Sequence, residues 1–161
     1  MIPRPLSSLT GDGRWFEDFP VGRRIRHARG ATVSEFLNNE LSKLVMNTAS
    51  GHWNEHATAA IGGRLVFGLL TGSLALGLTS QDTAENALAE LTLDQIRFAH
   101  PVHHGDTIYS YSEVLSAEPD PTRDDAGVVR FKHWGLNQND IVVFEGERTV
   151  QIKRRSRWGN R

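Results

Sequence analysis

The chain has 161 residues, of which 39% are hydrophobic and 23% charged, and its formal net charge is −1 at pH 7. These values are ordinary for a globular protein and give no sign of a nucleic-acid partner. The absence of cysteine excludes disulfides, thiolate metal sites and a cysteine nucleophile. Residues 1–19 lack a signal-peptide core, and the longest apolar run, residues 65–78, is too short to span a bilayer. We therefore expect one cytoplasmic domain over residues 1–161 with no membrane partner.

The first predicted helix follows Thr32-Val33-Ser34-Glu35, a capping-box pattern in which the Thr32 hydroxyl accepts from the Glu35 amide. A short strand is expected before Thr32. Apolar residues then recur at helical spacing, which predicts an amphipathic helix that ends near Met46. The residues of this stripe are Leu37, Leu41, Leu44 and Val45.

The apolar run 65–78 predicts a second helix, buried in the core. It contains Gly68, Gly72 and Gly77, and each glycine inside a helix costs roughly 1 kcal/mol relative to alanine. We therefore expect a sheet, or the thin part of a ligand, to pack closely against this helix.

From about residue 91 the hydrophobic pattern changes to a period of two, which is typical of strands. Strands are expected over residues 108–115, 128–135 and 141–153, with Phe131, Phe144 and Val150 in the core. Strands joined by short hairpins after a helical first half predict an α+β domain with one antiparallel sheet.

Residues 47–56, NTASGHWNEH, contain two histidines and admit two interpretations. His52, Glu55 and His56 match the zinc motif H-x-x-E-H, in which two histidines share a helix face and the glutamate polarises a metal-bound water. Alternatively, His52 is a single base with Asn47 beside it. The amides at the start of the buried helix could then hold a developing oxyanion.

Four stretches of the chain resemble the MaoC-like dehydratases, or R-specific enoyl-CoA hydratases, of the hot-dog fold. They read WFEDFPVG, RHARGATVSEFLNN, GGRLVFGLLTGSLALGL and IRFAHPVHHGDTIYSYSEVL, and the resemblance covers about residues 14–153. It implies one hot-dog domain, in which a long central helix is wrapped by a curved antiparallel sheet. It also implies a homodimer, or a higher oligomer, and a CoA or acyl-carrier-protein thioester as substrate. No metal or redox cofactor is implied.

The catalytic segment of this family usually reads D-x-N-P-x-H, so the resemblance places Asn47 at the Asp position and His52 at the His position. His52 is then expected to activate water or abstract a proton, and Asn47 to orient the water or the imidazole. Phe67-Gly68 stands where the family often has His-Gly, which makes the Gly68 amide the implied oxyanion donor and Phe67 a substrate contact. Asn54 stands where the mesaconyl-CoA hydratase-like branch often carries Asp, and it is expected to contact substrate. No chemistry is assigned to His100, His103 or His104.

The implied reaction is the reversible hydration of a 2-enoyl thioester, or the dehydration of a 3-hydroxyacyl thioester. Because Asn47 replaces the usual carboxylate, two alternatives stay open. One is a hot-dog acyl-CoA thioesterase, and the other is a subunit that binds acyl thioesters without catalysis.

Overall fold

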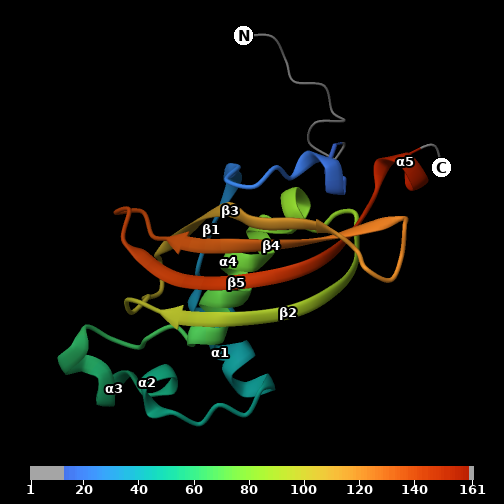
Figure 1. Ribbon diagram of the computed structural model, residues 1–161. Helices are drawn as coiled ribbons and strands as arrows, with labels where there is room; N and C mark the ends of the chain where they lie inside the picture. Colours follow the sequence, from blue (N-terminus) through green and yellow to red (C-terminus); the bar gives the residue numbers. More distant parts are fainter. Residues whose placement is uncertain (1–12, 160–161) are drawn as a thin grey trace.

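A curved antiparallel sheet wraps around one long helix in the computed structural model, which describes residues 13–159 (Figure 1). Its strand order is β1-β3-β4-β5-β2, so the three central strands form a meander and β2 closes one edge. The strands are β1 (Arg24–Thr32), β2 (Ala87–Phe98), β3 (Thr107–Pro119), β4 (Ala126–Leu136) and β5 (Val142–Lys153). This arrangement confirms the predicted α+β class with one antiparallel sheet. The predicted domain 1–161 also includes residues 1–12 and 160–161, which lie outside the described residues.

The long helix α4 (Gly68–Thr83) lies in the hollow of the sheet, and the shorter helices gather beyond its first turn (Figure 1). These are α1 (Glu35–Leu44), α2 (Ser50–Trp53), α3 (Glu55–Thr58) and the 3-10 turn η3 (Ala59–Ile61). Near the termini lie η2 (Phe16–Asp18) and α5 (Arg155–Trp158). No helix within residues 13–159 is long and apolar enough to cross a bilayer.

The core lies between α4 and the inner face of the sheet. Phe131, Phe144 and Val150 are all buried, as their alternation predicted. A Cβ added at Gly72 would lie 3.0 Å from the Phe144 ring, so the sheet packs against the helix backbone there as expected. The same expectation is wrong for Gly77, where nothing lies within 4 Å of such a Cβ.

The predicted start of α1 is wrong by two residues. Thr32 is the last residue of β1, and its hydroxyl lies 2.8 Å from that of Thr107 on β3. Ser34 caps the helix instead by accepting from the Leu37 amide at 3.1 Å. β1 continues to Thr32 because its pairing with β3 gives the backbone N–H and C=O groups there hydrogen-bond partners. A helix cap at Thr32 would have to replace these bonds.

The predicted apolar stripe of α1 does not face the core. Leu44 is 79% exposed and Val45 52% exposed, whereas Asn38 and Ser42 are buried on this helix. Only Leu41 of the stripe packs against the main core cluster. Asn38 is buried because it makes specific hydrogen bonds to the chain that leads into α4.

A chain of polar side chains, buried except for the partly exposed Asp82, crosses the other end of the core. His27 Nδ1 lies 2.8 Å from Asp82 Oδ2, and His27 Nε2 lies 2.7 Å from the Ser112 hydroxyl. Ser112 lies a further 2.7 Å from His133 Nδ1. The hydrogen bond from His27 lowers the pKa of Asp82 to about 2, and burial lowers the pKa of His133. Although three of these residue types match a Ser-His-Asp triad, Ser112 is only 1% exposed, so no substrate carbonyl reaches its hydroxyl.

Candidate active site

His52 lies on the short helix α2, with its ring fixed by a backbone carbonyl. Its Nδ1 lies 2.9 Å from the carbonyl oxygen of Leu65, and the ring centroid lies 5.6 Å from that of Phe67. A carbonyl oxygen can only accept, so Nδ1 must carry the hydrogen. In the neutral ring the lone pair is then on Nε2, which is the form that a general base requires.

The segment that holds His52 is itself anchored by Asn38 on α1, which is fully buried. Asn38 Oδ1 accepts from the Phe67 amide at 2.8 Å, and Asn38 Nδ2 lies 3.4 Å from the Leu65 carbonyl oxygen. Its Nδ2 also donates to His104 Nε2 at 3.0 Å. Burial lowers the pKa of His104, which favours the neutral ring that can accept this bond. Asn38 therefore fixes the backbone from Leu65 to the start of α4.

The other side of this segment is held by Arg64, whose side chain is 13% exposed. It donates to Glu55 at 2.7 Å and to Asn39 at 3.0 Å, and it also pairs with Glu35. The hydrogen bond from Arg64 lowers the pKa of Glu35. These bonds join α1 and α3 to the chain immediately before α4, and they neutralise the guanidinium.

Gly68 is the first residue of α4 and lines a slot of about 160 Å³. Amides in the first turn of a helix have no acceptor within the helix and point toward its N-terminus. The Phe67 amide already donates to Asn38, so the Gly68 amide is the next one that can donate to a ligand. A Cβ at Gly68 would lie 3.3 Å from the Phe98 ring, which forms one wall. The slot is lined by Leu65, Val66, Gly68, Thr71, Phe98, His100, Pro101, Val102 and Val143.

The predicted site residues are only partly brought together. Gly68 lines the slot. Phe67 precedes Gly68 in the chain, and His52 is hydrogen-bonded to the carbonyl of Leu65, which also lines the slot, but neither Phe67 nor His52 belongs to its walls. Asn47 Oδ1 accepts from the Ala49 amide at 3.1 Å, and within residues 13–159 the Asn47 side chain makes no hydrogen bond to His52. The expected orienting role of Asn47 stays a prediction.

Asn54 forms the N-cap of α3, where its Oδ1 accepts from the Ala57 amide at 3.0 Å. This contact gives the residue a structural role, and a contact with substrate stays a prediction.

The Asn54 cap also separates α2 from α3, so His52 and His56 do not share one helix face as the zinc motif requires. Glu55 is paired with Arg64, and residues 13–159 hold no cluster of three or more His, Cys, Asp or Glu suited to a metal ion.

The supports of His52 could not be read from the sequence. Leu65 orients His52 through its backbone carbonyl, a group that every residue has, so the sequence does not single it out. Asn38 lies on a helix whose apolar residues were expected to form the buried face. A signal did exist in the spacing of Asn38 and Ser42, which lie one turn apart and are both buried. Polar residues at this spacing usually mark an exposed face, so only the fold distinguishes the two cases.

The comparisons with known proteins agree with this architecture. Residues 3–154 match the family model described as mesaconyl-CoA hydratase. The mesaconyl-CoA hydratase of Haloarcula marismortui is 33% identical, and the match covers 93% of this chain and 45% of that protein. The β-methylmalyl-CoA dehydratase of Chloroflexus aurantiacus is 35% identical, with 90% of this chain and 46% of that protein covered. The chain thus spans about half the length of these curated relatives.

Solved structures confirm the fold. A MaoC-domain protein from Chloroflexus aurantiacus superposes with a TM-score of 0.83 at 29% identity, covering 92% of this chain and 47% of the other. A Mycobacterium tuberculosis protein with a double hot-dog fold superposes with a TM-score of 0.79 at 24% identity, covering 91% and 46%. With the family model spanning nearly the whole sequence, the chain belongs to the mesaconyl-CoA hydratase family, a branch of the MaoC-like hot-dog proteins.

Proposed function

We propose that this chain is a hydro-lyase that reversibly adds water to a 2-enoyl-CoA, with His52 as its base. The observation that carries the proposal is the hydrogen bond from His52 Nδ1 to the Leu65 carbonyl oxygen. It leaves Nε2 free to accept a proton without a carboxylate partner. The Leu65 carbonyl therefore orients the His52 imidazole, which is part of the role that the family assigns to Asp. Asn47 does not have to orient the ring.

In the hydration direction, His52 Nε2 removes a proton from water as the water oxygen bonds to C3 of the enoyl thioester. The electron pair of the double bond moves onto the thioester carbonyl oxygen, which becomes an enolate. The Gly68 amide, at the positive end of α4, stabilises that charge. His52 then returns its proton to C2, so that hydrogen and hydroxyl are both added and the base is regenerated. Asn47 remains the proposed group that orients the water.

The relatives' names support CoA as the acyl carrier, and we propose no resident metal or redox cofactor. We also propose that the chain works as a homodimer in the cytoplasm. Among the strands of residues 13–159, the edge strand β2 pairs only with β5, and it exposes Leu91, Leu93 and Ile96. The relatives are about twice as long, which is the length of two such domains. Sedimentation at micromolar concentration should give the mass of two chains, and a stable monomer would contradict the dimer.

The reaction is tested by incubating the protein with mesaconyl-CoA, crotonyl-CoA and longer 2-enoyl-CoAs. Hydration removes the absorbance of the conjugated enoyl thioester without releasing thiol, whereas a thioesterase releases free CoA. Loss of absorbance at a rate proportional to protein concentration supports the lyase. Thiol release in its place would establish the thioesterase, and binding with neither change would establish the non-catalytic subunit.

A further inference from the structure

Phe98 is the last residue of β2, and its ring closes one side of the slot beside Gly68. A Cβ added at Gly68 would lie 3.3 Å from this ring, and one added at Gly72, a turn further along α4, would lie 3.5 Å from it. The ring centroid of Phe98 lies 5.9 Å from that of Phe144. Of the described residues, Phe98 lines the slot, whereas Gly72 and Phe144 do not. Phe98 therefore separates the slot from Gly72 and Phe144.

The alternation of β2 does not by itself direct Phe98 toward α4. Asp94 belongs to the outer face of the sheet, because its carboxylate pairs at 2.7 Å with Arg130, whose neighbours along β4 face the core. Successive side chains of a strand point to opposite faces. Strict alternation after Asp94 would therefore point residue 97 toward α4 and residue 98 away from it.

One additional residue in β2 reverses these directions. Asp94 is paired with Glu147 of β5, and the next pair joins Arg97 to Glu145. Three steps along β2 thus match two steps along β5, which is a β-bulge. Arg97 consequently faces outward, with its guanidinium 2.9 Å from the Glu145 carboxylate, and Phe98 faces α4. Bulges next to active sites often re-aim a side chain in this way.

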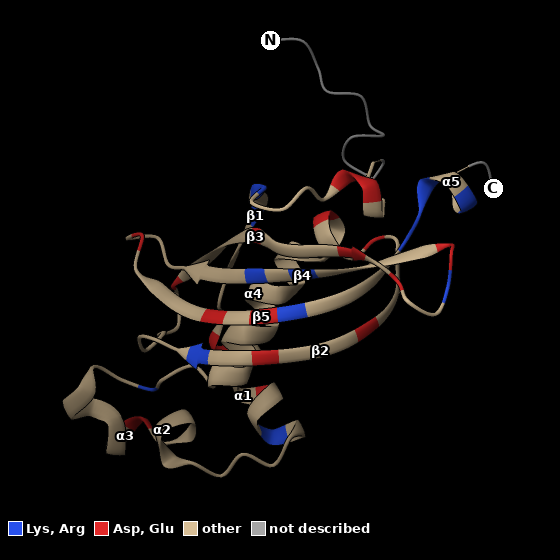
Figure 2. Cartoon of the chain, viewed as in Figure 1, with Lys and Arg blue, Asp and Glu red and all other residues tan. Residues whose placement is uncertain are grey.

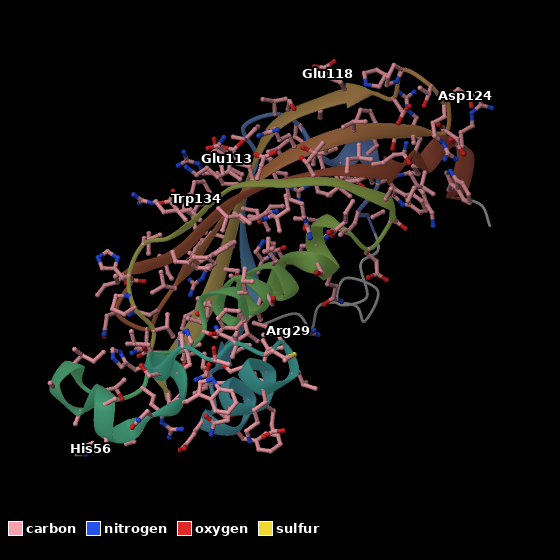
Figure 3. The ribbon with its side chains drawn as sticks, turned by 90° about the horizontal axis from the view of Figure 1, so that it is seen from below. Arg29, His56, Glu113, Glu118, Asp124 and Trp134 are labelled. Atoms are coloured by element: carbon pink, nitrogen blue, oxygen red, sulfur yellow. The ribbon has the colours of Figure 1, made fainter. Side chains whose placement is uncertain are left out.

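The outer face of the sheet suits Arg97 better than the slot does. Glu145 also pairs with Lys132 at 3.6 Å, and the Lys132 ammonium lies 5.2 Å from the centre of the Trp134 ring. Trp134 lies on the side of the sheet that is turned away from α4 (Figure 3). An Arg97 turned toward α4 would lose Glu145 and bring its charge to walls that are largely apolar, which is costly. The bulge therefore places both Arg97 and Phe98 on the faces that suit them.

Gln95 gives this bulge its unusual backbone, with a φ of 51°. Residues other than glycine rarely adopt a positive φ, and residues branched at Cβ adopt it least readily. The Gln95 side chain is exposed, so the position contributes a backbone conformation and not a buried side chain. Uncommon backbone conformations of this kind are concentrated at functional sites.

We propose that Gln95 is a positioning residue, whose bulge turns Phe98 into the slot and so limits the length of the acyl group that the site accepts. The inference rests on the proposed function, because the slot is taken to hold the acyl part of a thioester whose carbonyl lies at Gly68. The Phe98 ring stops this acyl chain from extending along α4 toward Gly72. When the bulge is loosened, the ring is no longer held against α4 and the slot becomes longer.

The test measures kcat/KM for crotonyl-CoA and for 2-octenoyl-CoA, which has a longer acyl chain. The wild type should prefer crotonyl-CoA about tenfold or more, since a single methylene group is worth about tenfold or more in an apolar pocket. Phe98→Ala opens the slot toward Gly72 and should raise the ratio of the octenoyl to the crotonyl value about tenfold or more.

Two substitutions at position 95 separate the role of the bulge from general stability. Gln95→Gly accepts a positive φ without steric cost and should retain the wild-type ratio. Gln95→Val opposes a positive φ and should raise the ratio in the same direction as Phe98→Ala, chiefly by lowering KM for 2-octenoyl-CoA. Each ratio compares two substrates on one protein sample, so a smaller folded fraction lowers both rates and leaves the ratio unchanged.

A ratio that Phe98→Ala leaves unchanged would overturn the proposal, and so would equal ratios for Gln95→Val and Gln95→Gly. Isothermal titration calorimetry with butyryl-CoA and octanoyl-CoA, which cannot be hydrated, makes the same comparison by affinity. If the variants shift affinity as expected but no enoyl-CoA is hydrated, the proposed reaction fails and the role of the bulge stands. If crotonyl-CoA is hydrated but the substitutions do not change the ratio, only the present inference fails.

Discussion

Asn38 offers the sharpest test of how the site is held in place. Replacing it with leucine keeps the volume of the buried side chain but removes its hydrogen bonds to Phe67, Leu65 and His104. The Phe67 amide then stays buried without an acceptor, which costs about 1 to 3 kcal/mol, and the lost bonds to Nδ2 add about 1 kcal/mol. Asn38→Leu should therefore lower the free energy of unfolding by about 2 to 4 kcal/mol.

The measurement is urea unfolding at equilibrium, followed by tryptophan fluorescence and by circular dichroism. Asn39→Leu is the control, because the neighbouring Asn39 accepts a hydrogen bond from Arg64 at a partly exposed position. Its expected cost is below about 1 kcal/mol. If Asn38→Leu costs no more than Asn39→Leu, then Asn38 does not anchor the segment before α4, and the account of how His52 is positioned fails with it.

Two further predictions concern the fold. Gly72→Ala forces a methyl group to within 3.0 Å of Phe144 and should destabilise the protein by about 1 to 3 kcal/mol. Gly77→Ala meets open space and should stabilise the protein by up to about 1 kcal/mol. Equal effects of the two substitutions in thermal unfolding would refute the close packing of Phe144 against Gly72. The Asp82 pKa of about 2, against 3.8 ordinarily, corresponds to about 2 kcal/mol of stability that is present above pH 4 and lost as pH falls toward 2. Asp82→Asn should flatten this part of the stability–pH curve, and an unchanged curve would refute the assignment to Asp82 and His27.

The strands were predictable because their signal is local. Alternation along β4 and β5 identified Phe131, Phe144 and Val150 as core residues, and all three are buried. Figure 2 shows charged residues distributed along the same strands, as expected when one face meets the core and the other carries polar groups. The long helix was also predictable from its apolar run, although it begins and ends later than that run.

The orientation of the first helix and the residues that hold His52 in place were harder to predict, because tertiary contacts there override the local hydrophobic pattern. The leucine stripe of α1 predicted a core-facing surface, yet the helix buries Asn38, whose amide bonds two backbone groups of a distant segment. Leu44 at the end of α1 and Met46 just after the helix are instead exposed. Likewise, the zinc interpretation of H-x-x-E-H requires one helix through His52 and His56, whereas the Asn54 cap divides this segment into α2 and α3.

The central claim is that His52 is the base of a hydration reaction, and it is tested most directly by the turnover of mesaconyl-CoA. Loss of a general base typically reduces a rate by 10² to 10⁴. His52→Ala should therefore lower kcat at least about 100-fold while circular dichroism and the thermal midpoint stay close to those of the wild type. His56→Ala, which removes an exposed histidine four residues away, should leave kcat unchanged. A folded His52→Ala protein that hydrates mesaconyl-CoA at the wild-type rate would contradict the account.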